Sequence, residues 1–248
     1  MIVSETPGTT RDSVDVTLEL DGKPFTVIDT AGLQKRKSLS GDIAFYSYHR
    51  AMRSVRRADV VALMIDASVP VSQVDKDLAG QIIKLCKPVV LVVNKWDLTA
   101  GKAQGEDYSE YLAKTFPELA FAPVSLTTAK DGVNVRETIR LAEQLHQQAT
   151  TRVSTADINK AIEESIEVRG PSHKAGTKPP KILYASQIAT APPTIVLFVN
   201  DARSFSETYQ RFLLNQLRKR LPFSEVPVRL LFRARRNWRE RLDPKDET

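Results

Sequence analysis

The chain contains the run Val89-Val90-Leu91-Val92-Val93-Asn94-Lys95-Trp96-Asp97. Its five consecutive apolar residues, four of them β-branched, predict a strand buried on both faces, as in a parallel sheet. The polar residues that follow then lie just beyond the carboxyl end of that strand. Because open α/β sheets bind their ligands at this edge, the run predicts both a fold class and the place of a binding site.

Strand-like and helix-like segments alternate on both sides of this run. A hairpin is expected where residues 14–20 and 25–28 are joined by Asp21-Gly22, and the apolar run 60–65 ends in Asp66. A short strand is expected at 121–124. The expected helices cover residues 45–57, 73–86, 106–116 and 134–148. This alternation predicts an α/β domain in which helices cover both faces of a parallel sheet.

The pattern changes after about residue 152. A helix at 155–168, strands at 181–187 and 194–200, a helix at 206–220 and a strand at 227–233 predict a separate, compact α+β unit. The fourth of these segments is amphipathic. Its apolar stripe is Tyr209, Phe212, Leu213, Leu217 and Leu221, and its expected outer face carries Arg211, Arg218, Lys219 and Arg220.

Composition limits the class of protein. Of the 248 residues Cys86 is the only cysteine, so no disulfide can form within the chain and a reducing cytoplasm is the expected location. No apolar run reaches the ~20 residues that cross a bilayer, so no membrane partner is expected. The net charge of +6 lies entirely in residues 156–248, which hold 17 Lys/Arg against 11 Asp/Glu. This excess is compatible with RNA binding and, equally, with a basic, solvated tail.

The residues Asn94, Lys95, Trp96 and Asp97 have the chemistry of a guanine site. The Asp97 carboxylate can accept hydrogen bonds from both the ring N–H and the exocyclic amine of guanine, a donor pair that adenine lacks. A wrong base would leave that carboxylate unpaired, which is a source of discrimination. The aliphatic part of Lys95 can cover the base, and Asn94 can connect neighbouring loops.

A second polar group follows the strand-like residues 25–28: Asp29, Thr30, Ala31 and Gly32. A carboxylate at a strand end can hold a water on Mg²⁺, and glycine lets a backbone N–H approach a phosphate oxygen. Upstream, the segment Pro7-Gly8-Thr9-Thr10-Arg11-Asp12 offers a hydroxyl that could complete the Mg²⁺ shell and sense a γ-phosphate.

A third element on the base side is expected in the loop after the next strand. Thr128, Ala129 and Lys130 are the leading candidates, with the Ala129 backbone N–H donating to the guanine oxygen. Ser125-Leu126 offers a competing register, and both registers remain open at this point.

This ordered set of motifs resembles the bacterial GTPase family Der, also called EngA. That family has two tandem GTPase domains and a C-terminal KH-like domain, and it assists assembly of the large ribosomal subunit and its RNA. The resemblance covers residues 1 to about 236. It implies a partial GTPase domain at 1–152, a KH-like domain at 153–236 and a basic, polar tail at 237–248.

The resemblance also implies roles for single residues. Thr10 and Leu33 would be catalytic residues. Thr10 would also be a Mg²⁺ ligand with Asp29, while Thr9 would lie near a potassium-binding loop. Leu33 stands where Ras-like proteins have a water-orienting glutamine, which implies the class in which K⁺ supplies charge. The residues implied to contact GTP or GDP are Thr9, Asp29, Thr30, Ala31, Gly32, Leu33, Asn94, Lys95, Trp96, Asp97, Thr128, Ala129 and Lys130.

The sequence departs from the family pattern in two places. It contains no Gly-x-x-x-x-Gly-Lys-Ser/Thr phosphate loop, so we expect a P-loop GTPase-type sheet without its first strand. The chain then resembles a fragment, whose natural partner would include the missing first GTPase domain. The expected KH-like part also lacks a Gly-x-x-Gly loop. The expected phosphate contacts are Arg229, Arg233, Arg235, Arg236, Arg239 and Arg241.

Two functions therefore stand side by side. The first is a ribosome-assembly factor that binds and hydrolyses GTP, present here in a form impaired in nucleotide binding. The second is a non-enzymatic RNA- or ribosome-binding module in which the remaining sheet serves only as a scaffold. A sheet without its first strand is also expected to expose an edge.

Overall fold

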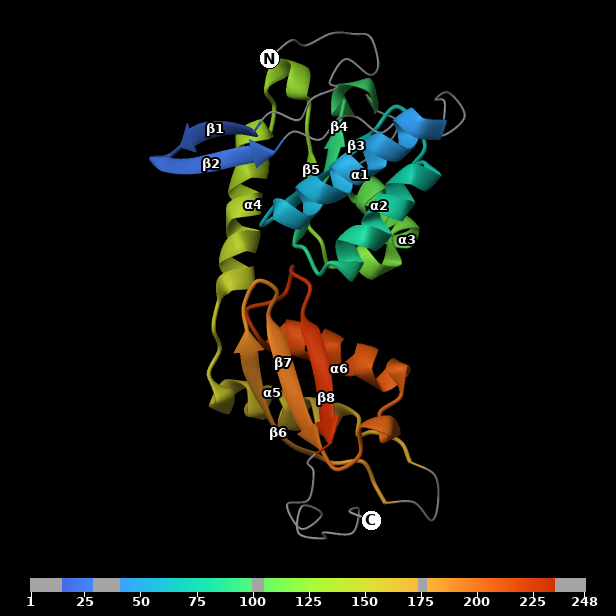
Figure 1. The fold of residues 1–248 in the computed structure, drawn as a ribbon, viewed down its shortest axis with the longest axis vertical. Coiled ribbons are helices and arrows are strands. Elements are labelled where there is room, and N and C mark those ends of the chain that lie inside the picture. The colour runs from blue at the N-terminus through green and yellow to red at the C-terminus, as the bar shows by residue number, and fades with distance from the viewer. Residues whose placement is uncertain (1–14, 29–40, 100–104, 174–177, 235–248) are drawn as a thin grey trace, which may run out of the picture. The chain divides into compact units, whose positions relative to one another are not determined.

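A computed structural model describes residues 15–28, 41–99, 105–173 and 178–234, with the backbone alone for residues 41–48. The predicted site residues Thr9 and Thr10, and those from Asp29 to Leu33, lie outside these ranges. The chain divides into two compact units, residues 1–142 and 143–248 (Figure 1). The functional boundary expected after residue 152 stays a prediction.

The first unit begins with the antiparallel hairpin of β1 (Asp15–Leu20) and β2 (Lys23–Ile28). Its turn, Asp21-Gly22, has φ angles of 53° and 75°, which suit a two-residue hairpin turn and favour these residue types. The Asp21 carboxylate accepts hydrogen bonds from Arg136 and Arg140 on α4 (Val135–Thr150). Hydrogen bonds from Arg140 and then Arg136 hold the pKa of Asp21 below its usual value. The hairpin turn is thereby attached to α4.

The parallel sheet has the strand order β3-β4-β5, formed by Val61–Asp66, Val89–Asn94 and Val124–Leu126. The connecting helices are α2 (Gln73–Lys84) and α3 (Gly105–Thr115), and α1 (Gly41–Arg57) precedes the sheet. Ser72 caps α2, because its Oγ accepts from the Asp75 N–H while the Asp75 carboxylate accepts from the Ser72 N–H. This parallel α/β arrangement confirms the predicted fold class.

The helices α1 to α3 form a core with one face of the parallel sheet. Leu63 and Ile65 of β3 and the odd-numbered residues of β4 are buried with residues of α1, α2 and α3. On the other face of β3, Ala62 is exposed and Met64 is 52% exposed. The continuous apolar run 60–65 would by itself predict a buried parallel strand, but β3 is buried on one face only, because the helices α1 to α3 pack against that face.

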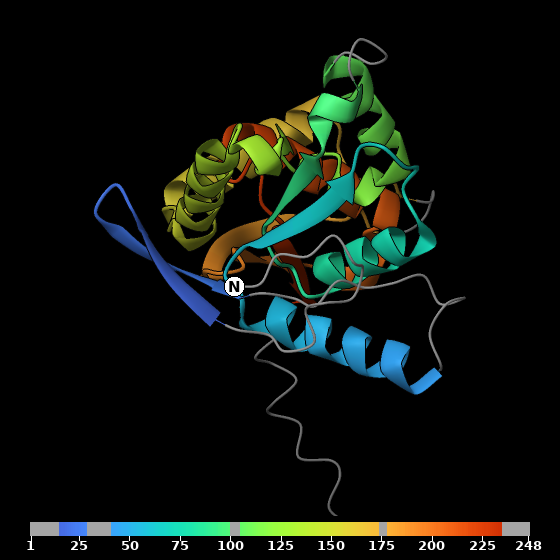
Figure 2. The same cartoon turned by 90° about the horizontal axis from the view of Figure 1, so that it is seen from above.

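The hairpin and the parallel strands form two separate sheets, and within the described ranges β2 and β3 are not paired with each other. Figure 2 shows the hairpin projecting beside the parallel strands rather than continuing them. This separation agrees with the expectation of an exposed sheet edge, since β3 has a hydrogen-bonded neighbour strand on one side.

The second unit has the element order expected from the sequence. It contains α5 (Thr155–Val168), β6 (Ile182–Ala189), β7 (Thr194–Val199), the 3-10 turn η5 (Ala202–Ser204), α6 (Glu207–Arg220) and β8 (Arg229–Ala234). In its sheet, β6 is antiparallel and β8 is parallel to the central strand β7. Ser154 and Ser206 cap the two helices through hydrogen bonds from the backbone N–H groups of Asp157 and Tyr209.

The amphipathic pattern of α6 is confirmed at its centre, whereas Phe212 of the expected stripe and Arg220 of the expected outer face are both half-buried. Tyr209, Leu213 and Leu217 are buried, as the stripe predicts. Arg218, which was expected on the outer face, is partly buried, and this burial lowers its pKa to about 10. Among the described residues, no helix combines the length and the apolar character needed to cross a membrane.

Candidate functional site

The carboxyl ends of β3 and β4 bring two polar residues together. Asp66 and Asn94 are partners in the parallel register, so both strands end at the same row. Lys95 follows in a left-handed backbone conformation with φ of 61°, which a side-chain-bearing residue adopts at a cost. Such strain is typical of functional sites and here turns the chain from β4 into the 3-10 turn η2 (Trp96–Thr99).

Asn94 connects the loops that follow β4 and β5. Its Oδ1 accepts hydrogen bonds from the Ala129 N–H at 3.0 Å and the Thr127 hydroxyl at 3.4 Å. The Trp96 N–H donates to the Thr127 carbonyl at 3.0 Å. The two predicted base-side segments, residues 94–97 and 128–130, are thus held side by side at one edge of the sheet. The Ala129 N–H, predicted to meet the guanine oxygen, is engaged by Asn94 in this structure.

Lys95 has a partner that sequence reasoning did not identify. Its Nζ donates to Oδ2 of Asp66 at 2.7 Å. The other carboxylate oxygen of Asp66 accepts from the N–H of Ser68 at 2.9 Å and from its hydroxyl at 2.6 Å. Burial alone would raise the pKa of Asp66, but the hydrogen bonds from Lys95 and Ser68 outweigh it, and the pKa lies below its usual value. The ammonium group of Lys95 is therefore held in place while its aliphatic part remains available to cover a base.

The residues around Asp97 leave its carboxylate accessible. Asp97 is exposed, and within the described part of the chain it has no hydrogen-bond or ion-pair partner. Next to it, the Trp96 ring packs edge-to-face on Tyr108 of α3, with 5.5 Å between centroids. The Thr99 hydroxyl donates to the Trp96 carbonyl at 2.6 Å, which closes the turn. Asp97 thus stands on a supported turn with both oxygens free to accept from a ligand.

The geometry of the loop after β5 favours one of the two registers left open by the sequence. Ser125 is buried, and its hydroxyl is hydrogen-bonded to that of Thr138 on α4 at 2.7 Å. Ala129 and Lys130 are exposed on the 3-10 turn η4 (Ala129–Asp131), beside the Asn94 contact. Thr128 is buried and forms a β-bridge with Val133. The leading candidates, Thr128 to Lys130, therefore lie nearer the predicted site than Ser125 does.

The predicted metal ligands cannot be placed, because Thr10 and Asp29 lie outside the described residues. Within the ranges that the structure describes, no group of three or more His, Cys, Asp or Glu side chains is arranged to hold a metal ion. The described edge thus supplies base-side groups, and its phosphate and metal side stays a prediction.

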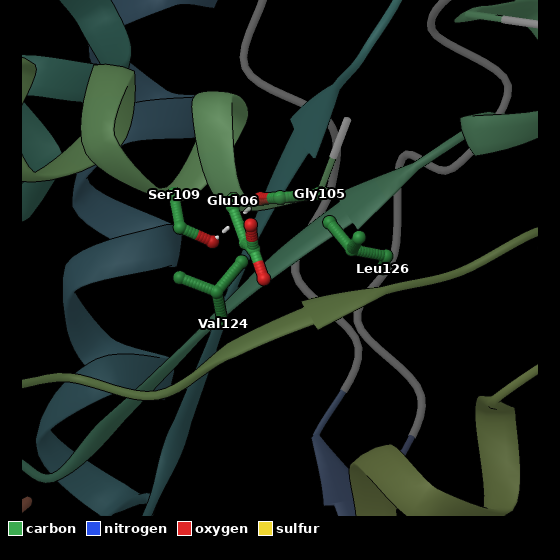
Figure 3. Close-up of a pocket in the computed structure, with 5 residues that line it drawn as sticks. All are labelled: Gly105, Glu106, Ser109, Val124 and Leu126. Atoms are coloured by element: carbon green, nitrogen blue, oxygen red, sulfur yellow. Dashed lines mark hydrogen bonds between the residues drawn. The ribbon is translucent and has the colours of Figure 1, made fainter. Parts of the chain in front are cut away.

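A pocket of about 560 Å³ lies between α3 and β5 (Figure 3). It is lined by Gly105, Glu106, Ser109, Val124 and Leu126. At Gly105 the helix approaches the strand so closely that an added Cβ would lie 2.9 Å from Leu126 Cδ1. None of the predicted nucleotide contacts lines this pocket, and the Glu106 carboxylate would repel a phosphate. The predicted base site is therefore the open edge beyond β4 and β5.

Comparisons with known proteins identify the relatives of this chain. A sequence-family model described as "KH-domain-like of EngA bacterial GTPase enzymes, C-terminal" matches residues 152–233, and one described as "50S ribosome-binding GTPase" matches residues 1–95. The chain is 46% identical over 235 residues to "GTPase Der" of Rhodopirellula baltica, covering 95% of this chain and 52% of that protein. The chain belongs to the Der (EngA) family.

Other relatives agree with this assignment. "GTPase Der" of a Nostoc species is 38% identical over 237 residues, which cover 95% of this chain and 52% of that protein. The chain thus spans about half the length of the curated Der proteins it matches. Among solved structures, Era in complex with MgGDPNP and nucleotides 1506–1542 of 16S ribosomal RNA aligns over 97% of this chain and 87% of Era. The TM-score is 0.51 at 20% identity, a likeness of fold.

Replacing Asp66 by asparagine is expected to weaken guanine binding modestly. Asparagine keeps the shape of the side chain but removes the charge that holds the Lys95 ammonium, and exposed ion pairs contribute about 0.2–1 kcal/mol. We expect a loss of about 1.4- to fivefold in affinity for GMP, measured by NMR titration. Asp77→Asn on the exposed side of α2 is the matched control and should bind as the parent does. An unchanged affinity in Asp66→Asn would show that the Lys95 contact does not support the base.

Proposed function

We propose that this chain is the guanine-binding and RNA-contacting part of a GTPase that acts in assembly of the large ribosomal subunit. The observation that carries the nucleotide assignment is the Asn94 Oδ1 contact with the Ala129 N–H at 3.0 Å. It joins the two loops whose residues would read the base, with Lys95 and Asp97 beside it. The match to a family model described as "50S ribosome-binding GTPase" supports the ribosomal part of the proposal.

Recognition of the base follows from donors and acceptors. Guanine presents its ring N–H and exocyclic amine, and the exposed Asp97 carboxylate accepts both. Lys95, fixed by Asp66, covers one face of the ring with its aliphatic part. To donate to the guanine oxygen, the Ala129 N–H would have to leave Asn94 Oδ1 or form a bifurcated hydrogen bond to both oxygens. Adenine offers no such donor pair, so the carboxylate would stay unpaired and the wrong base would be rejected.

The proposed chemistry is hydrolysis of GTP to GDP and phosphate. Phosphoryl transfer depends mainly on positioning and on neutralising the charge of the phosphate oxygens. Thr10 and Asp29 would hold Mg²⁺, which neutralises this charge when bound, and Thr9 would lie near a K⁺ site. Leu33 cannot orient a water by hydrogen bonding, so in this proposal its backbone contributes to the phosphate side.

We infer that the 248-residue chain on its own binds guanine nucleotide weakly. The sequence contains no Gly-x-x-x-x-Gly-Lys-Ser/Thr, so the backbone donors and the lysine that usually cradle the phosphates are not supplied by these residues. Within the described ranges, no strand pairing connects β2 of the hairpin to β3 of the parallel sheet. These observations also favour the second candidate function, a non-enzymatic RNA- or ribosome-binding module.

Isothermal titration calorimetry of the chain with GDP and Mg²⁺ separates these possibilities. We expect a dissociation constant weaker than about 1 μM, a free energy smaller than about 8 kcal/mol, because most phosphate contacts are not supplied. ADP is the control and should bind more weakly still. A sub-micromolar constant would contradict the proposed impairment, and equal heats for GDP and ADP would favour the non-enzymatic module.

A further inference from the structure

The sheet of the second unit has two unlike faces. Ala185 of β6 pairs with Leu197 of β7, and both side chains are fully buried. Leu197 is opposite Phe232 of β8, whose ring packs on Phe205 at 5.1 Å, directly before α6. These residues therefore mark the face covered by helices, and Figure 1 shows α5 and α6 behind the sheet. Because side chains alternate along a strand, the preceding or following residue of each strand lies on the other face.

On that other face, one row crosses all three strands. Tyr184 of β6 pairs with Phe198 of β7, which pairs with Arg233 of β8. The two rings are stacked, with 4.3 Å between centroids and 14° between planes. Each ring therefore has one surface outside the stack, and for Tyr184, which lies on the edge strand β6, this surface is turned away from Phe198. Tyr184 is 44% exposed, and Arg233 is exposed.

The charge of this face has a single sign. The strands β6, β7 and β8 contain no Asp or Glu, and their only charged residues are Arg229 and Arg233. These arginines are four positions apart on β8, so they lie on the same face, about 13 Å from each other. Both are exposed. We call Tyr184, Phe198, Arg229 and Arg233 the stacking face.

We propose that the stacking face binds single-stranded nucleic acid. An unpaired base would continue the ring stack on the outer surface of Tyr184, and the two arginines would contact phosphates of the same strand. Aromatic rings beside exposed basic side chains on one face of a sheet are suited to this ligand, since every base has a stacking surface. A duplex keeps its bases stacked on one another and cannot use Tyr184 in this way. That the strand is RNA rests on the proposed function.

The inference can be tested with the full chain and a fluorescently labelled 12-nucleotide RNA, followed by anisotropy over a salt series. Tyr184→Ala is expected to weaken binding about tenfold, because it removes one stacked base. Tyr184→Phe should bind as the parent does. Tyr184→Leu keeps an apolar side chain without the ring and should weaken binding as Tyr184→Ala does. It replaces the alanine variant in this test if that variant does not fold. Arg233→Ala should weaken binding and reduce the slope of log K against log salt by about 0.7.

The matched control is Arg211→Ala on the exposed side of α6, which removes the same charge and should leave binding unchanged. A duplex of the same sequence should bind more weakly than the single strand. Equal affinity for single-stranded RNA and DNA of one sequence would support binding of single strands by the stacking face. It would contradict a preference of this face for RNA. If the chain binds RNA and Tyr184→Ala binds equally well, the inference fails while the proposed function survives. If the chain binds no single strand, the inference and the RNA part of the proposed function both fail.

Discussion

Asp97→Asn is expected to weaken GMP binding by about tenfold to a hundredfold and to remove the preference for guanine. The carboxylate offers two acceptors to the two donors of guanine, whereas an amide offers one acceptor and one donor pair. A hydrogen bond to a charged group contributes about 1.5–3 kcal/mol, which sets this range. Xanthine carries an oxygen where guanine carries its amine, so the variant should bind XMP better than the parent chain does.

The comparison is made by NMR titration of the parent and the variant with GMP, XMP and AMP. Asp131→Asn is the matched control, because Asp131 is also an exposed carboxylate and ends the neighbouring turn η4. It should leave all three affinities unchanged. Should Asp97→Asn bind GMP as tightly as the parent, Asp97 does not read the base and the register of the site is wrong.

Leu213→Ala is expected to destabilise the second unit by about 2–5 kcal/mol. Leu213 is fully buried at the centre of the α6 stripe, and removal of three carbon atoms loses apolar burial and leaves a cavity. The measurement is hydrogen exchange of the β7 amides, whose protection should fall by the same free energy. Leu183→Ala is the matched control, because this leucine of β6 is 46% exposed and its truncation should cost less than about 1 kcal/mol. Equal effects of both changes would contradict the packing described here.

A strand could be predicted where its run of apolar residues is explained by burial within a sheet. Val89 to Val93 are all buried, so the continuous run was a reliable signal. The expected strand at 121–124 is wrong, because the strand β5 is Val124–Leu126. Ala122 instead packs into the core from the turn that follows the 3-10 turn η3 (Pro117–Leu119). Its apolar side chain therefore contributed to a sequence pattern that resembles a strand.

The position of the binding edge could be predicted from the sequence, but the hydrogen bonds that hold its residues in place could not. The position of Asn94 and Lys95 after a strand indicated the edge, and the structure adds the Asn94 contact with Ala129. Asp66 was visible as the polar end of a neighbouring strand, but its bond to Lys95 depends on the register between β3 and β4, which no local pattern encodes. Arg218 was misplaced for a related reason, because helical spacing cannot show how far a long side chain folds back over its neighbours.

Titration of the ¹⁵N-labelled chain with GMP and with AMP tests most directly whether the edge beyond β4 and β5 is specific for guanine. With GMP, we predict amide shift changes at Asn94 to Asp97 and at Thr127 to Lys130, because these backbone segments surround the base. With AMP, the same amides should stay unchanged at equal concentration. Equal changes with both nucleotides, or GMP-induced changes confined to other parts of the chain, would contradict the assignment of this edge as a guanine site.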